Sequence, residues 1–167
     1  MGRTGTIYRR VRAAVINKPT YFSWVIDGRL AASGLPSSAG QIRWLERNGI
    51  DAILTLREIP LPDEWFKGSN IRHKHISMAD HAPPSPEKLK QAADEIDSQL
   101  KEGRNVLVHC LAGVGRTGSS ISAYMILYQG KTAAEAIEAL RAARPGSVER
   151  NQEKAVYAFE NRFKAPG

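Results

Sequence analysis

One stretch of the chain, residues 106–118, limits the fold more strongly than any other. Its sequence, VLVHCLAGVGRTG, is a short apolar run that ends in a cysteine and is followed by a glycine-rich loop. Residues 117–129 then place Ile121, Tyr124 and Tyr128 at helical spacing and predict a largely buried helix. A strand, a glycine loop and a helix N-terminus form an anion site, because unpaired backbone amides and the positive end of the helix dipole point into the loop.

Two side chains in this loop suit a phosphate group. Arg116 presents a planar guanidinium that can bind two phosphate oxygens at once. Cys110 lies among positive groups, which should lower the pKa of its thiol below the ordinary value of about 8.5 and favour the thiolate. We expect Gly113, Gly115 and Gly118 to adopt positive φ angles, so that successive amides converge on one point. The loop therefore predicts a phosphate cradle with a nucleophile inside it.

Other interpretations compete with this one. A cysteine at the end of a strand is more often a small buried apolar residue, which is the alternative for Cys110. Residues 113–118 also match the G-x-G-x-x-G fingerprint of dinucleotide-binding folds, which needs a further strand and an acidic residue about 20 positions on. Glu135 and Glu138 lie near that distance, but both fall in a helical pattern with no strand after it. A Walker A loop is excluded, because it would require a lysine before Thr117.

The run from His109 to Gly118 resembles the signature loop of the cysteine-based protein tyrosine phosphatases. Cysteine, five spacer residues, arginine and then serine or threonine form a fairly specific pattern. Further segments resemble the small single-domain dual-specificity phosphatases and their archaeal relatives, namely residues 22–25, 28–31, 80–86 and 144–149. The resemblance covers residues 21–163 and implies a phosphoric monoester hydrolase that acts through a phosphocysteine intermediate.

The resemblance also implies the roles of the catalytic side chains. Cys110 is the expected nucleophile, Asp80 the general acid and then the base, and Thr117 a hydrogen-bond donor to the departing thiolate. The alternative for Asp80 is a turn or capping carboxylate. Phosphate would be held by the Arg116 guanidinium and by a row of backbone amides, those of Leu111, Ala112, Gly113, Val114, Gly115 and Arg116.

Two further residues are expected to support the reaction. His109 should order the cysteine by bonding the loop backbone, and its alternative is simple core packing. Gln152 should position the attacking water, although its spacing from the preceding Arg-Pro-Gly segment is one residue shorter than in related enzymes. His73, His75 and His81 show no metal-ligand spacing, so neither a metal nor a cofactor is expected.

The whole pattern predicts one α/β phosphatase domain over residues 21–167, with a mainly parallel central sheet of about five strands flanked by helices. Predicted strands cover residues 22–27, 29–33, 51–56, 71–76 and 105–109. Helices are expected to begin at Ser37 or Ser38 and near Pro86, Thr117, Thr132 and Asn151. The loops that carry Asp80 and Cys110 both follow strands, and ligand sites of such sheets lie at the carboxyl ends of the strands. In the long loop 57–70, Trp65 and Phe66 should pack on the body rather than border the cleft.

Charge is concentrated at the N-terminus. Residues 1–20 contain five basic residues and no acidic one, so they carry +5 of the net charge of +7, and the other 19 basic and 17 acidic residues carry +2. We predict a solvated basic extension over residues 1–20. The alternatives are contact with nucleic acid or an anionic membrane surface, or N-myristoylation at the Met1–Thr6 pattern.

Composition indicates a cytoplasmic enzyme. The chain has a single cysteine, which cannot form an internal disulfide, and it shows no signal-peptide pattern and no apolar run of the roughly 20 residues that span a bilayer. We expect phosphorylated protein substrates, inorganic phosphate as product and inhibitor, no membrane or nucleic-acid partner, and a monomer.

Substrate class is less constrained. The tryptophan-led acid loop of tyrosine-specific relatives is missing, which favours mixed activity on phosphotyrosine and phosphoserine or phosphothreonine. Leu111 and Val114 stand where phosphoinositide phosphatases often carry lysines. The alternatives are an RNA 5′-triphosphatase of the same superfamily and a non-catalytic phosphate-binding module. Pro83, Pro84 and Pro86 predict a stiff acid loop that is nearly closed without substrate.

Overall fold

A computed structural model describes residues 17–164. They form one five-stranded sheet in the order β1-β2-β5-β3-β4, in which β1 is antiparallel to β2 and all other neighbours are parallel. The strands are β1 (Ser23–Ile26), β2 (Leu30–Ser33), β3 (Ala52–Thr55), β4 (Arg72–His75) and β5 (Val106–His109). The helices are α2 (Ala39–Arg47), the 3₁₀ helix η1 (Asp63–Phe66), α3 (Pro86–Lys101), α4 (Gly115–Tyr128), α5 (Ala133–Ala143) and α6 (Arg150–Phe163). The predicted α/β class with a mainly parallel sheet is confirmed.

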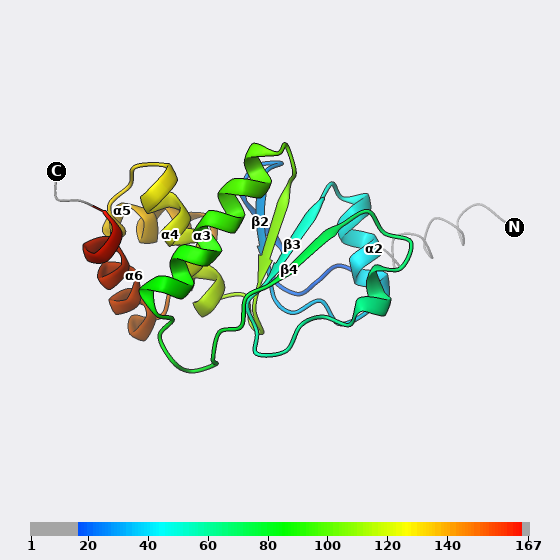
Figure 1. Cartoon of the computed structure of the whole chain (residues 1–167), viewed down its shortest axis with the longest axis horizontal. Coiled ribbons are helices and arrows are strands. Elements are labelled where there is room, and N and C mark those ends of the chain that lie inside the picture. The colour runs from blue at the N-terminus through cyan, green and yellow to red at the C-terminus, as the bar shows by residue number, and fades with distance from the viewer. Residues whose placement is uncertain (1–16, 165–167) are drawn as a thin grey trace, which may run out of the picture.

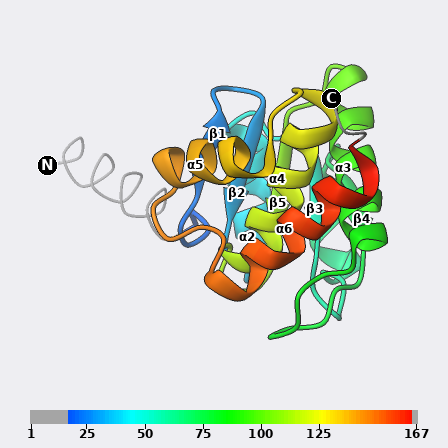
Figure 2. The same ribbon diagram turned by 90° about the vertical axis from the view of Figure 1, so that its left-hand side faces the viewer.

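Helices cover both faces of the sheet (Figure 1). Helices α3 to α6 lie on one face, and α2 with η1 lies on the other, as the side view also shows (Figure 2). The central strand β5 is buried along its whole length because it faces both layers: Val106 and Val108 join the core under α3 to α6, while Leu107 joins the core under α2. Trp65 and Phe66 pack against this second core, as predicted.

Local capping signals explain where most helices begin. Ser85 accepts a hydrogen bond from the Lys88 amide, and Pro86 occupies the first turn of α3, as predicted. Thr132 and Glu135 form the predicted capping box of α5. Helix α4 differs: it begins at Gly115, two residues before the predicted start, and its N-cap residue Val114 offers no side-chain hydrogen bond. The first amides of α4 therefore remain available to a ligand in the preceding loop.

The N-terminal predictions fall mostly outside the described residues. The myristoylation pattern and most of the basic extension belong to residues 1–16, so the extension stays a prediction. Lys18 lies over the rings of Phe22 and Trp44, and the Thr20 carbonyl accepts the Gly34 amide, so the last residues of the predicted extension contact the body. Within residues 17–164, no helix is both long and apolar enough to span a membrane.

Candidate active site

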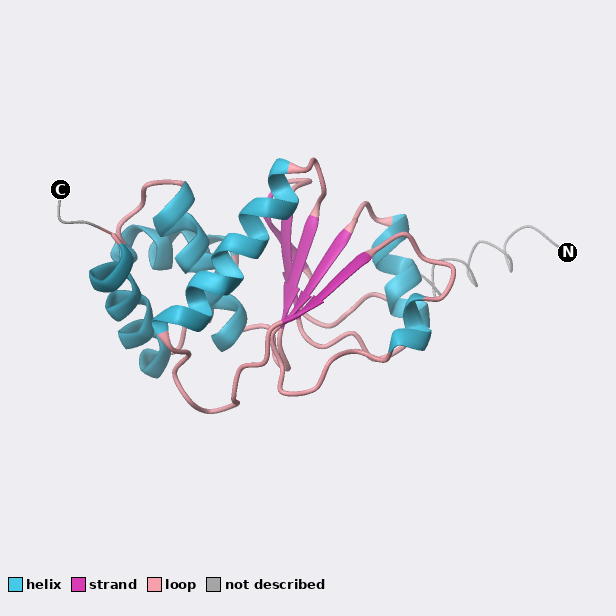
Figure 3. Ribbon diagram, in the orientation of Figure 1, coloured by secondary structure: helices cyan, strands magenta, loops and turns pink. Residues whose placement is uncertain are grey.

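The two loops of the predicted site leave the same end of the sheet (Figure 3). The phosphate loop, residues 110–116, follows β5 and runs into α4, and the acid loop, residues 77–85, follows β4 and runs into α3. They meet around a cleft of about 330 Å³, which Glu149, Asn151 and Gln152 at the start of α6 also border. Parallel neighbours end at one edge of a sheet, so the fold itself brings the loops together.

Cys110 lies at the floor of this cleft. Its side chain is 3% exposed, and its Sγ accepts a hydrogen bond from the Gly113 amide at 3.3 Å. The backbone turns back on itself because Gly113 adopts φ +77°. An added Cβ at that position would lie 2.3 Å from the Ser33 carbonyl oxygen, so no larger residue fits. This is the convergent loop that the sequence predicts.

The prediction of positive φ was wrong for Gly115 and Gly118, since among the glycines of this stretch only Gly113 has one. Close packing explains the other two instead. A Cβ at Gly115 would lie 2.3 Å from Gln152 Nε2, and a Cβ at Gly118 would lie 3.0 Å from Val148 Cγ2. These two glycines let Val148, just before α6, and Gln152, in the first turn of α6, approach the start of α4.

His109 anchors the base of the phosphate loop. It is buried, and its Nδ1 lies 3.0 Å from the Cys110 carbonyl oxygen while its Nε2 lies 2.7 Å from Thr55 Oγ1. A carbonyl only accepts, so Nδ1 carries the proton and Thr55 donates to Nε2. Thr55 in turn lies 3.0 Å from His73 Nε2 and accepts from it. Burial lowers the pKa of His109 to about 4, so the ring is neutral at pH 7.

Arg116 connects the phosphate loop to the two neighbouring strand ends. Its side chain is only 5% exposed. Its Nη1 donates to the Met78 carbonyl at 3.0 Å and to Glu58 Oε2 at 3.2 Å, and its Nη2 lies 3.1 Å from Asp80 Oδ1. Groups from the segments after β3 and β4 thus hold both terminal nitrogens of the guanidinium and fix its orientation at the cleft.

Glu58 is a site residue that sequence analysis missed. It follows β3, and its Oε1 accepts the Asp80 amide while its Oε2 accepts from Arg116. Hydrogen bonds from its own amide and from the Asp80 amide, together with Arg116, hold the pKa of Glu58 below its usual range. The available signal was its place just after a predicted strand, at the edge where Asp80 and Cys110 also lie.

The acid loop presents Asp80 beside the arginine. The Asp80 carboxylate also accepts the His81 amide at 3.0 Å, and its Oδ2 lies 3.3 Å from His81 Nε2. His81 itself is largely exposed and adopts φ +57°, a strained conformation for a residue other than glycine. The general-acid candidate and the phosphate-binding candidate are therefore adjacent.

Thr117 and Gln152 lie where the sequence placed them but with different contacts. Thr117 is buried in the first turn of α4, and among the described residues its Oγ1 has no hydrogen-bond partner, Cys110 Sγ included. Gln152 borders the cleft, and its Oε1 accepts the Glu149 amide at 3.0 Å in the capping box of α6. The Gln152 amide nitrogen is left facing the start of α4.

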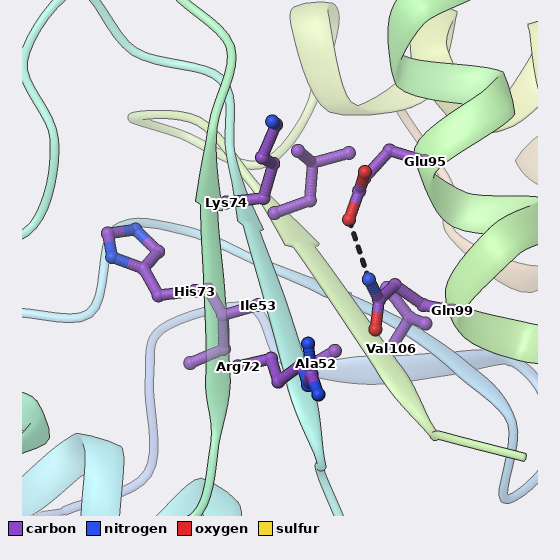
Figure 4. Close-up of a pocket in the computed structure, with 9 residues that line it drawn as sticks. Ala52, Ile53, Arg72, His73, Lys74, Glu95, Gln99 and Val106 are labelled. Carbon is purple, nitrogen blue, oxygen red and sulfur yellow. Dashed lines mark hydrogen bonds between the residues drawn. The ribbon is translucent and has the colours of Figure 1, made fainter. Parts of the chain in front are cut away.

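A second hollow lies between the sheet and α3, toward the amino ends of the strands (Figure 4). It encloses about 190 Å³ and is bordered by Arg72 and Lys74 of β4 and by Glu95 and Gln99 of α3. Gln99 donates a hydrogen bond to Glu95. No phosphate-loop or acid-loop residue reaches it. Within the described part of the chain, no three histidine, cysteine or acidic side chains are grouped to hold a metal ion.

Comparisons with known proteins agree with this geometry. Residues 19–156 match the family model described as the DSP-PTPase phosphatase domain of a Swiss Army Knife protein. The tyrosine-protein phosphatase CDC14 of Saccharomyces cerevisiae is 30% identical over 123 residues, covering 74% of this chain and 22% of that protein. The CDC14 homolog of Schizosaccharomyces pombe is 36% identical over 107 residues, covering 64% of this chain and 20% of that protein. The chain thus spans about a fifth of the length of these relatives.

Solved structures show the same fold. Tk-PTP in its active form superposes with a TM-score of 0.76 at 28% identity, covering 86% of this chain and 98% of that chain. A kinase-associated phosphatase with its catalytic cysteine replaced by serine gives a TM-score of 0.75 at 20% identity, covering 89% of this chain and 98% of that chain, a likeness of fold alone. With its cysteine loop, its sheet order and a family match over most of its length, this chain belongs to the DSP-PTPase family of dual-specificity and tyrosine phosphatases.

Proposed function

We propose that the protein hydrolyses phosphotyrosine, and also phosphoserine or phosphothreonine, in protein substrates through a phosphocysteine intermediate. One observation carries the proposal: Cys110, Arg116 and Asp80 line a single cleft, with Asp80 Oδ1 3.1 Å from Arg116 Nη2, although Asp80 comes from a different strand. A nucleophile, a phosphate-binding cation and a proton donor are the three groups that monoester hydrolysis needs.

In the first step, the Cys110 thiolate attacks phosphorus and forms the S–P bond. The bond from phosphorus to the leaving oxygen breaks, and Asp80 gives that oxygen a proton, so an alcohol or phenol departs. The phosphate-loop amides and Arg116 hold the three equatorial oxygens throughout. Because Glu58 binds both the Asp80 amide and Arg116, it fixes the position of the general acid relative to the phosphate-binding arginine.

In the second step, the Asp80 carboxylate takes a proton from water, which attacks phosphorus. The S–P bond breaks, phosphate leaves, and Cys110 returns to the thiolate. Gln152 supports this step from the rim of the cleft by positioning the water, and the buried Thr117 hydroxyl, which has no partner among the described residues, donates to the departing sulfur.

The neutral state of His109 bears on how the thiolate is stabilised. With a pKa of about 4, this ring carries no positive charge at pH 7. The thiolate therefore depends on the Gly113 amide, the N-terminus of α4 and Arg116 rather than on a cysteine–histidine ion pair. His109 contributes by holding the Cys110 carbonyl in place.

Charges around the cleft support a substrate with one phosphate group. Among the described residues (17–164) that line it, Arg116 is the one lysine or arginine, whereas Asp80 and Glu149 are acidic. A polyphosphate would meet these carboxylates without compensating cations, which disfavours the RNA 5′-triphosphatase alternative. We further propose that the enzyme works as a monomer in a reducing, cytoplasmic setting, that inorganic phosphate inhibits it as product, and that it needs neither membrane nor nucleic acid.

Phosphate release tests the proposal. It should be measured from an aryl phosphate and from phosphopeptides for the wild type, Cys110→Ser and Asp80→Asn over about pH 4 to 8. Asp97→Asn is a matched control, because Asp97 pairs with Lys101 on α3, away from the cleft. We expect Cys110→Ser to abolish activity, Asp80→Asn to flatten the alkaline limb, and Asp97→Asn to change neither. Activity that survives Cys110→Ser would overturn the mechanism, and an inactive wild type that binds phosphopeptides would favour the non-catalytic module.

A further inference from the structure

A buried arginine behind the phosphate loop has no place in the reaction steps above. Arg144 follows α5, which lies against β1 (Figure 2), and its side chain is 1% exposed. Its hydrogen-bond partners are neutral: the carbonyl oxygens of Tyr21, Ala32 and Gly113 and the hydroxyl of Ser23. Burying a guanidinium among neutral groups is costly, so a purely structural account would favour an apolar residue here.

One of these contacts reaches the phosphate loop. Arg144 Nη2 donates to the Gly113 carbonyl at 2.9 Å. In a planar trans peptide the carbonyl and the next amide point in opposite directions. The Val114 amide is therefore turned away from Arg144, toward the side of the loop that borders the cleft. On the other side of Gly113, its own backbone N–H donates to Cys110 Sγ.

Glycine at this position makes such a hold necessary. Gly113 adopts φ +77°, and glycine visits positive and negative φ with similar ease. Without an external contact, the peptide that joins Gly113 to Val114 is free to rotate and to turn its carbonyl oxygen toward a bound anion. A carbonyl oxygen there would repel phosphate and thiolate alike.

Arg144 is itself fixed from three sides. Its Nη1 donates to the Tyr21 carbonyl at 2.8 Å, to Ser23 Oγ at 2.6 Å and to the Ala32 carbonyl at 3.1 Å. The Tyr21 ring covers the guanidinium, with 4.0 Å from its carbon to the ring centroid, and the Tyr21 hydroxyl donates to the Pro145 carbonyl. A lysine has one compact ammonium group and cannot bridge these sites to Gly113 as the planar guanidinium does.

We propose that Arg144 is a positioning residue of the phosphatase site, whose guanidinium fixes the Gly113–Val114 peptide so that the loop amides converge on phosphate and on the Cys110 thiolate. The role rests on the proposed function, but two of its consequences need no turnover. Phosphate affinity and the pH dependence of thiol reactivity both report the loop amides directly.

The test compares Arg144→Lys and Arg144→Ala with a matched control, Arg29→Ala. Arg29 is a half-buried arginine at the far end of β2, and it also binds neutral groups, the Leu100 carbonyl and Asn105 Oδ1. Three quantities are measured: the rate of Cys110 alkylation by iodoacetamide against pH, the Kd for inorganic phosphate, and the melting temperature. Turnover of an aryl phosphate is recorded beside them.

We expect both Arg144 variants to slow the alkylation of Cys110 near neutral pH by about tenfold, because a less stabilised thiolate is less populated. They should weaken phosphate binding and lower kcat/KM on the order of 10- to 100-fold, less than the roughly 100- to 1,000-fold loss on removing an oxyanion donor outright, because the loop amides remain but lose their fixed direction. Added guanidinium ion should partly restore Arg144→Ala. Arg29→Ala should lower the melting temperature by a similar amount and leave the alkylation profile and the phosphate Kd unchanged.

The proposal is overturned if the Arg144 variants lose stability as Arg29→Ala does while the alkylation profile and the phosphate Kd stay at wild-type values. If neither Arg144 variant folds, Tyr21→Leu takes their place. It uncovers the guanidinium without removing it, and it should shift the same two readouts in the same direction, by about threefold in Kd; unchanged readouts would again overturn the role. A wild type without turnover would refute the proposed function but would leave both readouts in place to judge Arg144.

Discussion

Replacing Gly115 by alanine should act through Gln152. The new Cβ would lie 2.3 Å from Gln152 Nε2, 2.7 Å from its Cδ and 2.9 Å from its Oε1. Ordinary contact begins near 3.4 Å, so the amide group must retreat by roughly 1 Å. The contact atoms are the end of a flexible side chain rather than backbone, so we expect the fold to survive and Gln152 to leave its position.

Two losses follow from that displacement. The bond from the Glu149 amide to Gln152 Oε1, half of the α6 capping box, is broken, which should lower the free energy of unfolding by about 1 kcal/mol. If Gln152 positions the attacking water as proposed, that role is also lost, and hydrolysis of the phosphocysteine should slow more than its formation. Rapid-quench assays with an aryl phosphate should then show a burst of phenol release followed by a slower steady state.

A double-mutant cycle separates this cause from general damage. If displacement of Gln152 is the whole effect, Gly115→Ala and Gln152→Ala should give similar bursts, and the double variant should be no worse than either. Gly40→Ala is the control. Gly40 lies in the first turn of α2, outside the cleft, and a Cβ there would also come close to the end of a side chain, 2.9 Å from Asn17 Oδ1. Additive effects in the double variant, or a burst in Gly40→Ala, would refute the reasoning.

Three further predictions concern the groups around the loop. The pKa of His109 falls from 6.5 to about 4 on folding, so between these pH values the unfolded state binds more protons than the folded state. The free energy of unfolding should therefore drop by about 3 kcal/mol as pH falls from 6.5 to 4. Urea titrations at several pH values should show that His109→Gln removes this part of the pH dependence of stability, and an unchanged pH dependence would contradict the prediction. Glu58→Gln should lower the hydrolysis rate of alkyl phosphates about tenfold more than that of aryl phosphates with good leaving groups. A poorly placed Asp80 matters most where the leaving oxygen needs a proton. Equal losses of rate for both substrates would mean that Glu58 acts on phosphate binding alone. Crystals with and without phosphate should show the proline-rich acid loop in one position with similar B-factors, and a large closure on binding would disprove its stiffness.

The sequence predicted what local signals encode. Strand β5, the glycine loop and helix α4 follow from an apolar run, a glycine cluster and helical spacing, and the caps at Ser85 and Thr132 follow from residue type. The prediction of a positive φ angle was correct for Gly113 and wrong for Gly115 and Gly118. Glycine suits either a left-handed turn or a close approach of two chain segments, and only the surrounding structure shows which of these roles applies.

Glu58 and Arg144 escaped prediction for a different reason. Residues 144–149 resemble a segment of related phosphatases, but that resemblance gave Arg144 no role. The partners of Arg144 come from β1, β2 and the phosphate loop, which only the folded chain assembles. Glu58 was one acidic residue among 17, although its position at a strand end could have singled it out. Roles defined by tertiary contact need the fold before they can be assigned.

The sheet order has a consequence for how the chain matures. Strand β5 is the last strand to be synthesised, yet it fills the gap between β2 and β3, pairing Leu30 with Val106 on one side and Ala52 with Val106 on the other. Until it emerges from the ribosome, the earlier strands present unpaired apolar edges, which are prone to aggregate. Such long-range parallel pairing is also slow to form. Closing the sheet and creating the cysteine loop are thus one event, so a nascent or truncated chain that lacks β5 has neither a complete core nor any phosphatase chemistry.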